Sequence, residues 1–320
     1  MDFQILKSNL TNPTLLFFVL GVLAVIIKSD LEIPASSSKF ISLYLLFSIG
    51  FKGGQELAHS GFTTEIIYSL LFGLAIASII PLYTFFILKR KMSISDAGAV
   101  AAAYGSVSAV TFIAAVSFLE AQKIIFGGHM VAVMAMMESP AIIMGVILLM
   151  KYDAGNHGEG KLTETIKHSF TNGSVLMILG SLIIGIIADT KQAEGIKPFT
   201  TDIFKGFLAI FLLEMGMVTA NRFSAFRKYG WFASAFAIII PMINGCIVAA
   251  VSGMVTHDVG NRFIFAVLAA SASYIAVPAA MRLAAPKADP GLYIPMALGI
   301  TFPFNITVGM PVYMMIVANT

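Results

Sequence analysis

Residues 104–111 read YGSVSAVT and residues 271–278 read SASYIAVP, and each stretch lies within a long apolar run. Gly105 lowers helix propensity by about 1 kcal/mol relative to alanine. Pro278 lacks a backbone N–H and disfavours helical geometry at the residue before it. The two stretches therefore predict helices that are interrupted near their middle, with small hydroxyl side chains at each interruption.

The composition predicts a polytopic membrane protein. Hydrophobic residues make up 58% of the 320-residue chain and charged residues only 12%, whereas soluble proteins carry about 25% charged residues. A membrane-spanning helix needs about 20 residues, so the chain has room for about ten. One cysteine excludes an intrachain disulfide or a cysteine-based metal cluster. The net charge of +3 is too small to indicate a nucleic-acid partner.

Ten apolar segments divide into two sets of five. They are residues 13–27, 40–57, 64–88, 96–119, 124–150, 170–188, 201–220, 229–255, 260–285 and 292–318. The longest hydrophilic stretch falls at the centre of the chain, which predicts a first repeat over residues 1–151, a linker over 152–168 and a second repeat over 169–320.

Short motifs recur in the same order in both halves, which indicates internal repetition. Ile79-Ile80-Pro81 returns as Ile239-Ile240-Pro241, and the two hydroxyl-bearing stretches occupy corresponding helices. Because each half has an odd number of helices, the second half enters the membrane in the opposite orientation. We therefore expect an all-α inverted repeat, an architecture common among secondary transporters.

The distribution of lysine and arginine predicts the orientation. Most of the 20 basic residues flank helix ends on the side opposite the N-terminus, and the positive-inside rule places that side in the cytoplasm. Both termini then lie outside a bacterial inner membrane, and the central linker is cytoplasmic.

The paired interruptions are the predicted binding site. A broken helix leaves free N–H groups and a positive dipole end that attract an anion, while nearby carbonyls and hydroxyls can coordinate sodium. The alternative for any single serine is a helix-packing hydrogen bond. Matched breaks in both halves favour function, because such pairs mark the substrate sites of transporters.

Three further side chains are sodium-ligand candidates. Glu138 lies in an apolar segment beside an expected break at Pro140, and a charge at mid-membrane usually has a partner or a role. Asn305 offers an amide oxygen, although a packing hydrogen bond explains it equally well. Ser108 supplies a hydroxyl at the first interruption.

At these residues the chain resembles the sodium-dependent bicarbonate transporter family (SbtA-type permeases). The resemblance is carried by Gly105–Thr111, Glu120 with Lys123-Ile124, Glu138-Ser139-Pro140, Met215-Gly216-Met217, Ala270–Ser273 with Pro278 and Arg282, and Pro303 with Pro311.

The resemblance implies ten helices in two inverted five-helix repeats with two broken, crossing helices, as in bile-acid symporters and sodium/proton antiporters. It implies a core domain of helices 3–5 and 8–10, a gate domain of helices 1, 2, 6 and 7, and a homotrimer that moves bicarbonate with sodium. The substrate-binding residues would be Gly105, Ser106, Val107, Ser108, Thr111, Ser271, Ala272, Ser273 and Tyr274.

The chain departs from the family pattern at several polar positions. Tyr274 stands where the family has aspartate, while Ala276 and Val110 stand where it has serine. The family's lysine and glutamate appear here four residues away, as Lys52 and Glu214. Four residues are about one helical turn, so we expect these two to form a displaced charge pair.

Other readings stay open at this point. A cation/proton antiporter would use Glu138 as its carrier, and a membrane receptor would bind the anion without moving it. The family resemblance brings a PII-like regulatory protein into consideration as a partner, for which the chain shows no motif. An enzyme is not expected, because the serines have no base in the same segment. The chain also has no nucleotide-binding motif, so no organic cofactor is expected.

Overall fold

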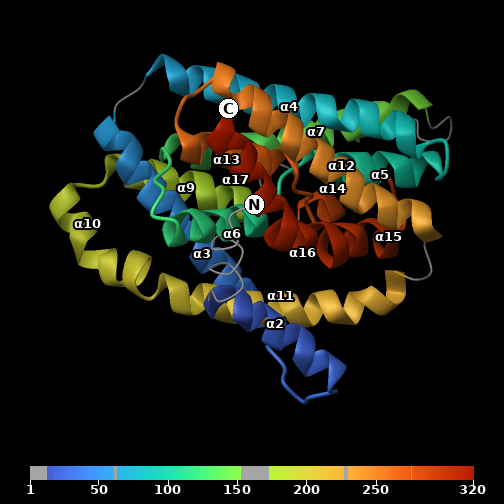
Figure 1. The fold of residues 1–320 in the computed structure, drawn as a ribbon, viewed down its shortest axis with the longest axis horizontal. Helices are drawn as coiled ribbons and strands as arrows, with labels where there is room; N and C mark the ends of the chain where they lie inside the picture. The colour runs from blue at the N-terminus through green and yellow to red at the C-terminus, as the bar shows by residue number, and fades with distance from the viewer. Residues whose placement is uncertain (1–12, 61–62, 153–172, 227–229, 275) are drawn as a thin grey trace.

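The computed structural model describes residues 13–60, 63–152, 173–226, 230–274 and 276–320, and every regular element in them is helical (Figure 1). The predicted linker at 152–168 lies outside the described residues apart from its first residue. The elements of the first half are α2 (Pro13–Ile26), α3 (Ala35–Ser60), α4 (Thr64–Leu88), α5 (Ile94–Gly105), α6 (Ala109–Ala121) and α7 (His129–Tyr152).

The second half begins with α9 (Gly173–Ile187), α10 (Thr190–Lys197), α11 (Phe204–Phe226) and α12 (Gly230–Val251). It continues with α13 (Val259–Ala269), α14 (Ala276–Ala284), α15 (Pro290–Pro295), α16 (Phe302–Phe304) and α17 (Met310–Asn319). Wider π-type turns at Pro198–Asp202, Met296–Thr301 and Asn305–Gly309, and a tighter 3-10 turn at Ser252–Met254, connect several of them.

Six helical stretches of the described chain are long and apolar enough to cross a membrane. They are Thr64–Leu88, Ile94–Ala121, His129–Tyr152, Thr190–Asn221, Gly230–Met254 and Pro290–Asn319. Three shorter apolar helices, Leu16–Ile26, Val175–Ile187 and Val259–Ala269, accompany them. The chain is thus a multi-pass, all-α membrane protein, and the ten-span layout stays a prediction.

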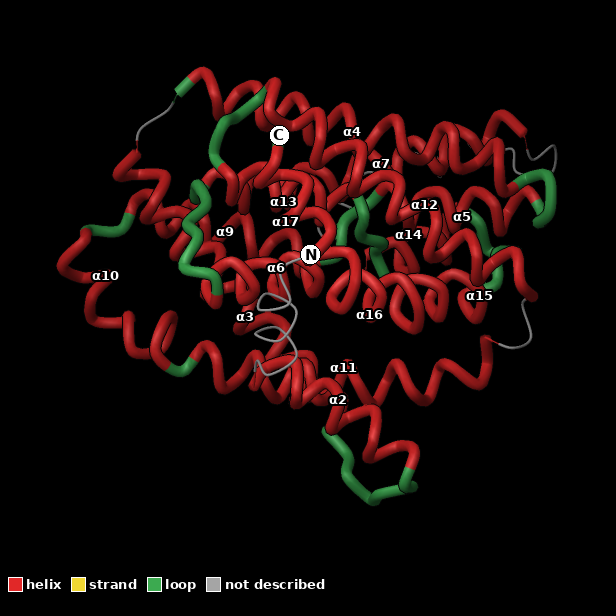
Figure 2. The backbone as a smooth tube through the Cα atoms, in the orientation of Figure 1, coloured by secondary structure: helices red, strands yellow, loops and turns green. Residues whose placement is uncertain are grey.

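The helices form two groups with the same contact pattern in each half (Figure 2). In one group α2 packs on α11 and α3 packs on α9. We call these four helices the four-helix layer. In the other group α4, α5 and α7 pack together, as α12, α13 and α17 do, and we call this group the core. Contacts between α6 and α13, and between α5 and α14, join the two halves of the core.

Glycines permit the close crossings of the four-helix layer. A Cβ on Gly54 would collide with the Leu182 carbonyl oxygen of α9, and a Cβ on Gly185 with the Phe51 carbonyl of α3. Gly216 of α11 meets the Phe18 carbonyl of α2 in the same way. Small residues at such crossings let helix backbones approach closely, which is how membrane helices gain packing contacts in lipid.

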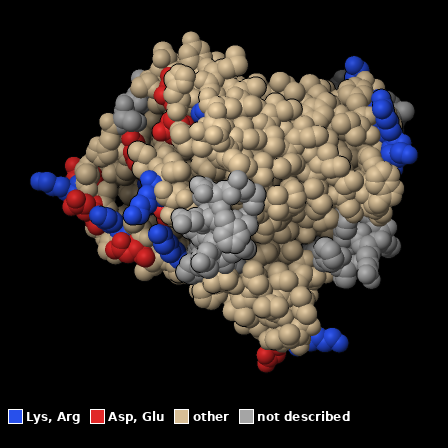
Figure 3. Space-filling model, viewed as in Figure 1, with Lys and Arg blue, Asp and Glu red and all other residues tan. Residues whose placement is uncertain are grey.

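The surface agrees with membrane residence. Figure 3 shows the charged side chains towards the ends of the long axis and at the α2–α3 connection, with an uncharged surface between them. Large apolar side chains are exposed along α4, α9 and α12, including Ile67, Leu71, Ile184, Ile239 and Ile247. An apolar surface this wide would be unstable in water and is suited to lipid.

Two local features differ from the sequence prediction. The segment before α11 contains an additional short helix, α10, whose first N–H groups are capped by the Asp189 carboxylate. The break expected at Pro140 is wrong, because α7 continues through it as one helix. A proline inside a membrane helix is tolerated where neighbours satisfy the freed backbone groups.

Candidate functional site

The first interruption lies between α5 and α6. A Cβ on Gly105, the last residue of α5, would collide with the Pro81 ring of α4, so glycine is required there. Beyond it, Ser106 donates its N–H to the Ala102 carbonyl at 2.9 Å. Ser108 then begins α6, where its Oγ accepts from the Thr111 N–H at 3.2 Å. A serine at this position caps a helix by satisfying one of its free N–H groups.

The second interruption lies between α13 and α14. Ser271 closes the end of α13 by donating its N–H to the Leu268 carbonyl at 3.1 Å. Pro278 lies in the first turn of α14, where the missing N–H has no intrahelical partner to lose. The proline therefore places the start of a new helix, as the sequence indicated.

The two interruptions meet inside the core (Figure 2). Ser108 N–H donates to Ser271 Oγ at 3.1 Å, and Ser273 N–H donates to the Ala103 carbonyl at 2.8 Å. Ser271 Oγ in turn donates to the Leu268 carbonyl at 2.8 Å. Segments more than 160 residues apart are thus joined by two hydrogen bonds between buried residues.

The crossing presents polar backbone in an otherwise apolar interior. Ala109 and Val110 are the first two residues of α6, and their N–H groups have no acceptor within the helix. The third N–H group, that of Thr111, donates to Ser108 Oγ. These groups and the helix dipole favour an anion. Val107 and Ala272, also predicted to bind substrate, are buried apolar residues.

Tyr274 reaches from the crossing towards the four-helix layer. It is half-buried, and its hydroxyl lies 3.9 Å from the Met215 Sδ of α11. The phenol occupies space at the boundary between the core and α11, where a shorter aspartate would leave room. Tyr274, one of the predicted substrate-binding residues, therefore connects the crossing to the four-helix layer.

Asn305 holds the end of α13 in place. It is fully buried, and its Nδ2 donates to the Ala270 carbonyl at 2.6 Å. Its Oδ1 accepts from the Tyr313 hydroxyl at 3.0 Å. Of the two roles considered from sequence, the structure displays the packing hydrogen bonds.

Glu138 lies beside the first interruption. Its backbone carbonyl accepts from Ser106 Oγ at 3.4 Å, and its side chain is half-buried. The ion pairs of the described residues do not include its carboxylate. A hydrogen bond between the Tyr104 hydroxyl of α5 and the Thr301 hydroxyl, at 2.8 Å, also holds the end of α5 in place. The sequence did not predict this bond, because neither residue belongs to a recognisable motif.

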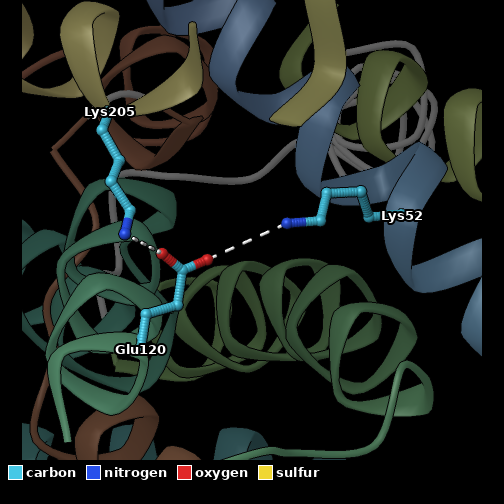
Figure 4. Close-up of polar contacts among 3 residues, drawn as sticks. All are labelled: Lys52, Glu120 and Lys205. Carbon is cyan, nitrogen blue, oxygen red and sulfur yellow. Dashed lines mark ion pairs between the residues drawn. The ribbon is translucent and has the colours of Figure 1, made fainter. Parts of the chain in front are cut away.

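The expected pair between Lys52 and Glu214 is wrong for the described residues. Lys52 Nζ lies 3.8 Å from Glu120 Oε1, and Lys205 Nζ lies 3.4 Å from Glu120 Oε2 (Figure 4). Lys205 and Glu214 are nine residues apart on α11, about 13 Å along the helix axis. Glu214 therefore lies at another level of the layer, where its Oε2 has no hydrogen-bond partner.

Glu214 instead lines a separate cavity between α3 and α9. The cavity measures about 930 Å³ and is largely apolar, with polar groups from Ser38, Lys39, Ser42 and Ser181. It does not include the residues of the crossing. The displaced charge pair inferred from sequence thus becomes two separate features, an ion cluster at Glu120 and a carboxylate in this cavity.

Comparison with known proteins indicates the family. The family model of the Na+-dependent bicarbonate transporter superfamily matches residues 13–318, nearly the whole chain. None of the curated proteins matches the chain.

Proposed function

Since this chain belongs to the Na+-dependent bicarbonate transporter superfamily, we propose that it is a secondary active transporter that carries bicarbonate together with sodium. Transport would proceed by alternating access, with the core moving against the four-helix layer. The proposal explains why the buried serines Ser106, Ser108, Ser271 and Ser273 gather where two helices are interrupted.

The crossing of the two interruptions is the observation that carries the proposal. It joins Ser108 to Ser271 and Ser273 to Ala103 within a buried, apolar interior. Free N–H groups at the start of α6 are suited to the oxygens of a small anion. Bicarbonate is a planar monoanion with oxygen acceptors, so it matches these donors in size and charge.

We place sodium on the oxygen side of the same crossing. The end of α5 presents backbone carbonyls, because the last carbonyls of a helix lack intrahelical donors. Ser108 Oγ, Asn305 Oδ1 and the Glu138 carboxylate are the side-chain oxygens that we propose as further ligands. Glu138 is the anionic member of this set, and its negative charge would favour binding of a cation at this site.

The repeated contact pattern supports an inverted repeat of five helices in each half. The packing of α2 on α11 corresponds to that of α9 on α3, and that of α4 on α7 to that of α12 on α17. We further propose ten spans, a cytoplasmic linker between the halves and both termini outside a bacterial inner membrane. The family resemblance adds a homotrimer as the proposed assembly.

Uptake into proteoliposomes tests the function. Purified protein is reconstituted, and entry of labelled bicarbonate is followed with an inward sodium gradient and with potassium in its place. We expect uptake that depends on the sodium gradient and is lost in Ser108→Pro, which removes the donor to Ser271 and the α6 cap. Ser78→Ala is the control, because its hydroxyl bonds only to Leu74 of its own helix.

Other outcomes point to other functions. Equal uptake with sodium or potassium would overturn the coupling to sodium. Saturable bicarbonate binding without uptake would indicate a receptor. Proton flux driven by a sodium gradient, in the absence of bicarbonate movement, would indicate an antiporter.

A further inference from the structure

Three side chains from three helices form an ion cluster between the core and the four-helix layer. Glu120 ends α6 in the core, whereas Lys52 of α3 and Lys205 of α11 belong to the layer (Figure 4). Each lysine lies against a different oxygen of the carboxylate, at 3.8 and 3.4 Å. In Figure 4 both ammonium groups point towards Glu120 from opposite sides.

Glu120 is placed unfavourably by its own helix. It lies in the last turn of α6, where the negative end of the helix dipole disfavours a carboxylate. The two lysines offset this effect from outside the helix. The side chains are 36%, 30% and 69% exposed for Lys52, Glu120 and Lys205, so water screens both pairs. Exposed pairs of this kind contribute little stability and exchange readily.

The cluster has room for a ligand beside it. A cavity of about 220 Å³ is lined by Lys52 and Glu120 together with Glu56, Phe126 and apolar residues. At about 30 Å³ for each water molecule, this volume holds several waters or one small anion. A second cavity of about 230 Å³ is also lined by Lys52 and Glu56, together with Gln55, Glu194, Lys197 and three threonines. Lys52 is thus accessible from both.

We propose that Lys52 and Lys205 form a second site for a small planar monoanion, and that the Glu120 carboxylate occupies it in this conformation. A carboxylate and bicarbonate share a planar, delocalised negative charge on two oxygens, so Glu120 is an intramolecular competitor for the site. With Glu120 displaced, the two lysines outweigh the nearby Glu56, and the local charge is +1.

The exchange has a consequence for the core. Glu120 lies at one end of α6, and Ser108 begins the other end of the same 13-residue helix. An anion that displaces Glu120 frees α6 from α3 and α11 on this side of the molecule. The arrival of the anion would then release the core for movement, an extension that rests on the proposed function.

Anion binding to the purified full chain tests the site without a transport assay. Unfolding temperature is followed in detergent while potassium formate, a planar monoanion, replaces potassium chloride at constant ionic strength and without sodium. We expect Glu120→Gln to reach half-maximal stabilisation at about a three- to ten-fold lower formate concentration than the native chain, because the competitor is gone.

Further variants distinguish formate binding at the two lysines from the general effect of removing a carboxylate. Lys52→Gln added to Glu120→Gln should remove the gain, whereas Glu120→Asp, which retracts the charge by one methylene, should give an intermediate response. Glu32→Gln, in the connection between α2 and α3 and away from the cluster, is the control for the loss of an exposed carboxylate. Because each variant is compared with its own formate-free unfolding temperature, a change in stability alone does not imitate binding.

The proposal is overturned if Glu120→Gln responds to formate as the native chain and Glu32→Gln do, or if Lys52→Gln leaves the gain unchanged. If Glu120→Gln does not fold, the single variants Glu120→Asp and Lys52→Gln decide the question. Glu120→Asp should then be stabilised by formate more than the native chain is, and Lys52→Gln less. A formate response with these properties would stand even if sodium-driven bicarbonate uptake were absent, so the two proposals fail separately.

Discussion

Ser271 supports the crossing with one hydroxyl that makes two hydrogen bonds. Its Oγ accepts from the Ser108 N–H and donates to the Leu268 carbonyl, and the residue is 1% exposed. A buried donor left without a partner costs about 1–3 kcal/mol. The position therefore couples the stability of the core to the geometry of the candidate site.

We predict that Ser271→Ala lowers the free energy of unfolding by about 1–3 kcal/mol. Bicarbonate uptake should fall by at least the same factor as the equilibrium constant for folding. Thermal unfolding in detergent and proteoliposome uptake measure the two effects. Ser234→Ala is the matched control, since that hydroxyl bonds only to Gly230 of its own helix. An unfolding temperature equal to that of the native chain would contradict the role of this bond.

Tyr274 shows how one residue can change the character of a site. Its ring lies between the crossing and Met215, in the position where the family resemblance implies an aspartate. A phenol donates one hydrogen bond and carries no charge near neutral pH, so the chain supplies less negative charge at this point. Among the side chains proposed above as sodium ligands, Glu138 then supplies the negative charge.

At the scale of elements, glycines determine how closely the helices of the four-helix layer cross. Gly185 faces the Phe51 carbonyl of α3, whereas Gly180, five residues earlier on α9, has open space where its Cβ would be. The same helix thus contains one glycine that the crossing needs and one that it does not.

We predict that Gly185→Ala forces α9 away from α3 and destabilises the protein by about 1–3 kcal/mol, as overpacking does. Gly180→Ala should be neutral or stabilise by up to about 1 kcal/mol, because alanine favours the helix. Unfolding temperatures of the two variants test the pair. Equal effects at both positions would show that the α3–α9 crossing is not as close as described.

At the scale of the whole molecule, an ion pair between distant parts of the chain links the two groups of helices. Lys52 contacts Glu120 rather than Glu214, which ties the four-helix layer to the core instead of joining two helices within the layer. In the proposed alternating-access movement, a contact between the two groups would have to break, whereas a contact within the layer would not.

Double-mutant cycles distinguish the two pairings. Lys52→Gln and Glu120→Gln should be non-additive in unfolding free energy by about 0.2–1 kcal/mol, the usual coupling of an exposed ion pair. Lys52→Gln and Glu214→Gln should be additive, since residues without shared contacts seldom couple. Coupling in the second cycle and none in the first would restore the pair expected from sequence.

Several features of the chain follow from its sequence alone. The long apolar segments require a membrane, and the paired interruptions at Gly105–Ser108 and before Pro278 follow from local backbone chemistry, which acts over a few residues. The recurring motifs and the resemblance then indicate the family. These predictions succeed because helix propensity, proline geometry and hydrophobicity are local or compositional properties.

Only the tertiary structure decides which distant groups meet. It joins Ser108 to Ser271 by a hydrogen bond, and it pairs Lys52 with Glu120 instead of Glu214. Asn305 forms hydrogen bonds with Ala270 and Tyr313. Helix α7 continues through Pro140. A sequence pattern assigns a residue to a helix face, but the partner across that face depends on how helices cross. The crossings depend on close packing at glycines such as Gly54 and Gly185, which no local rule specifies.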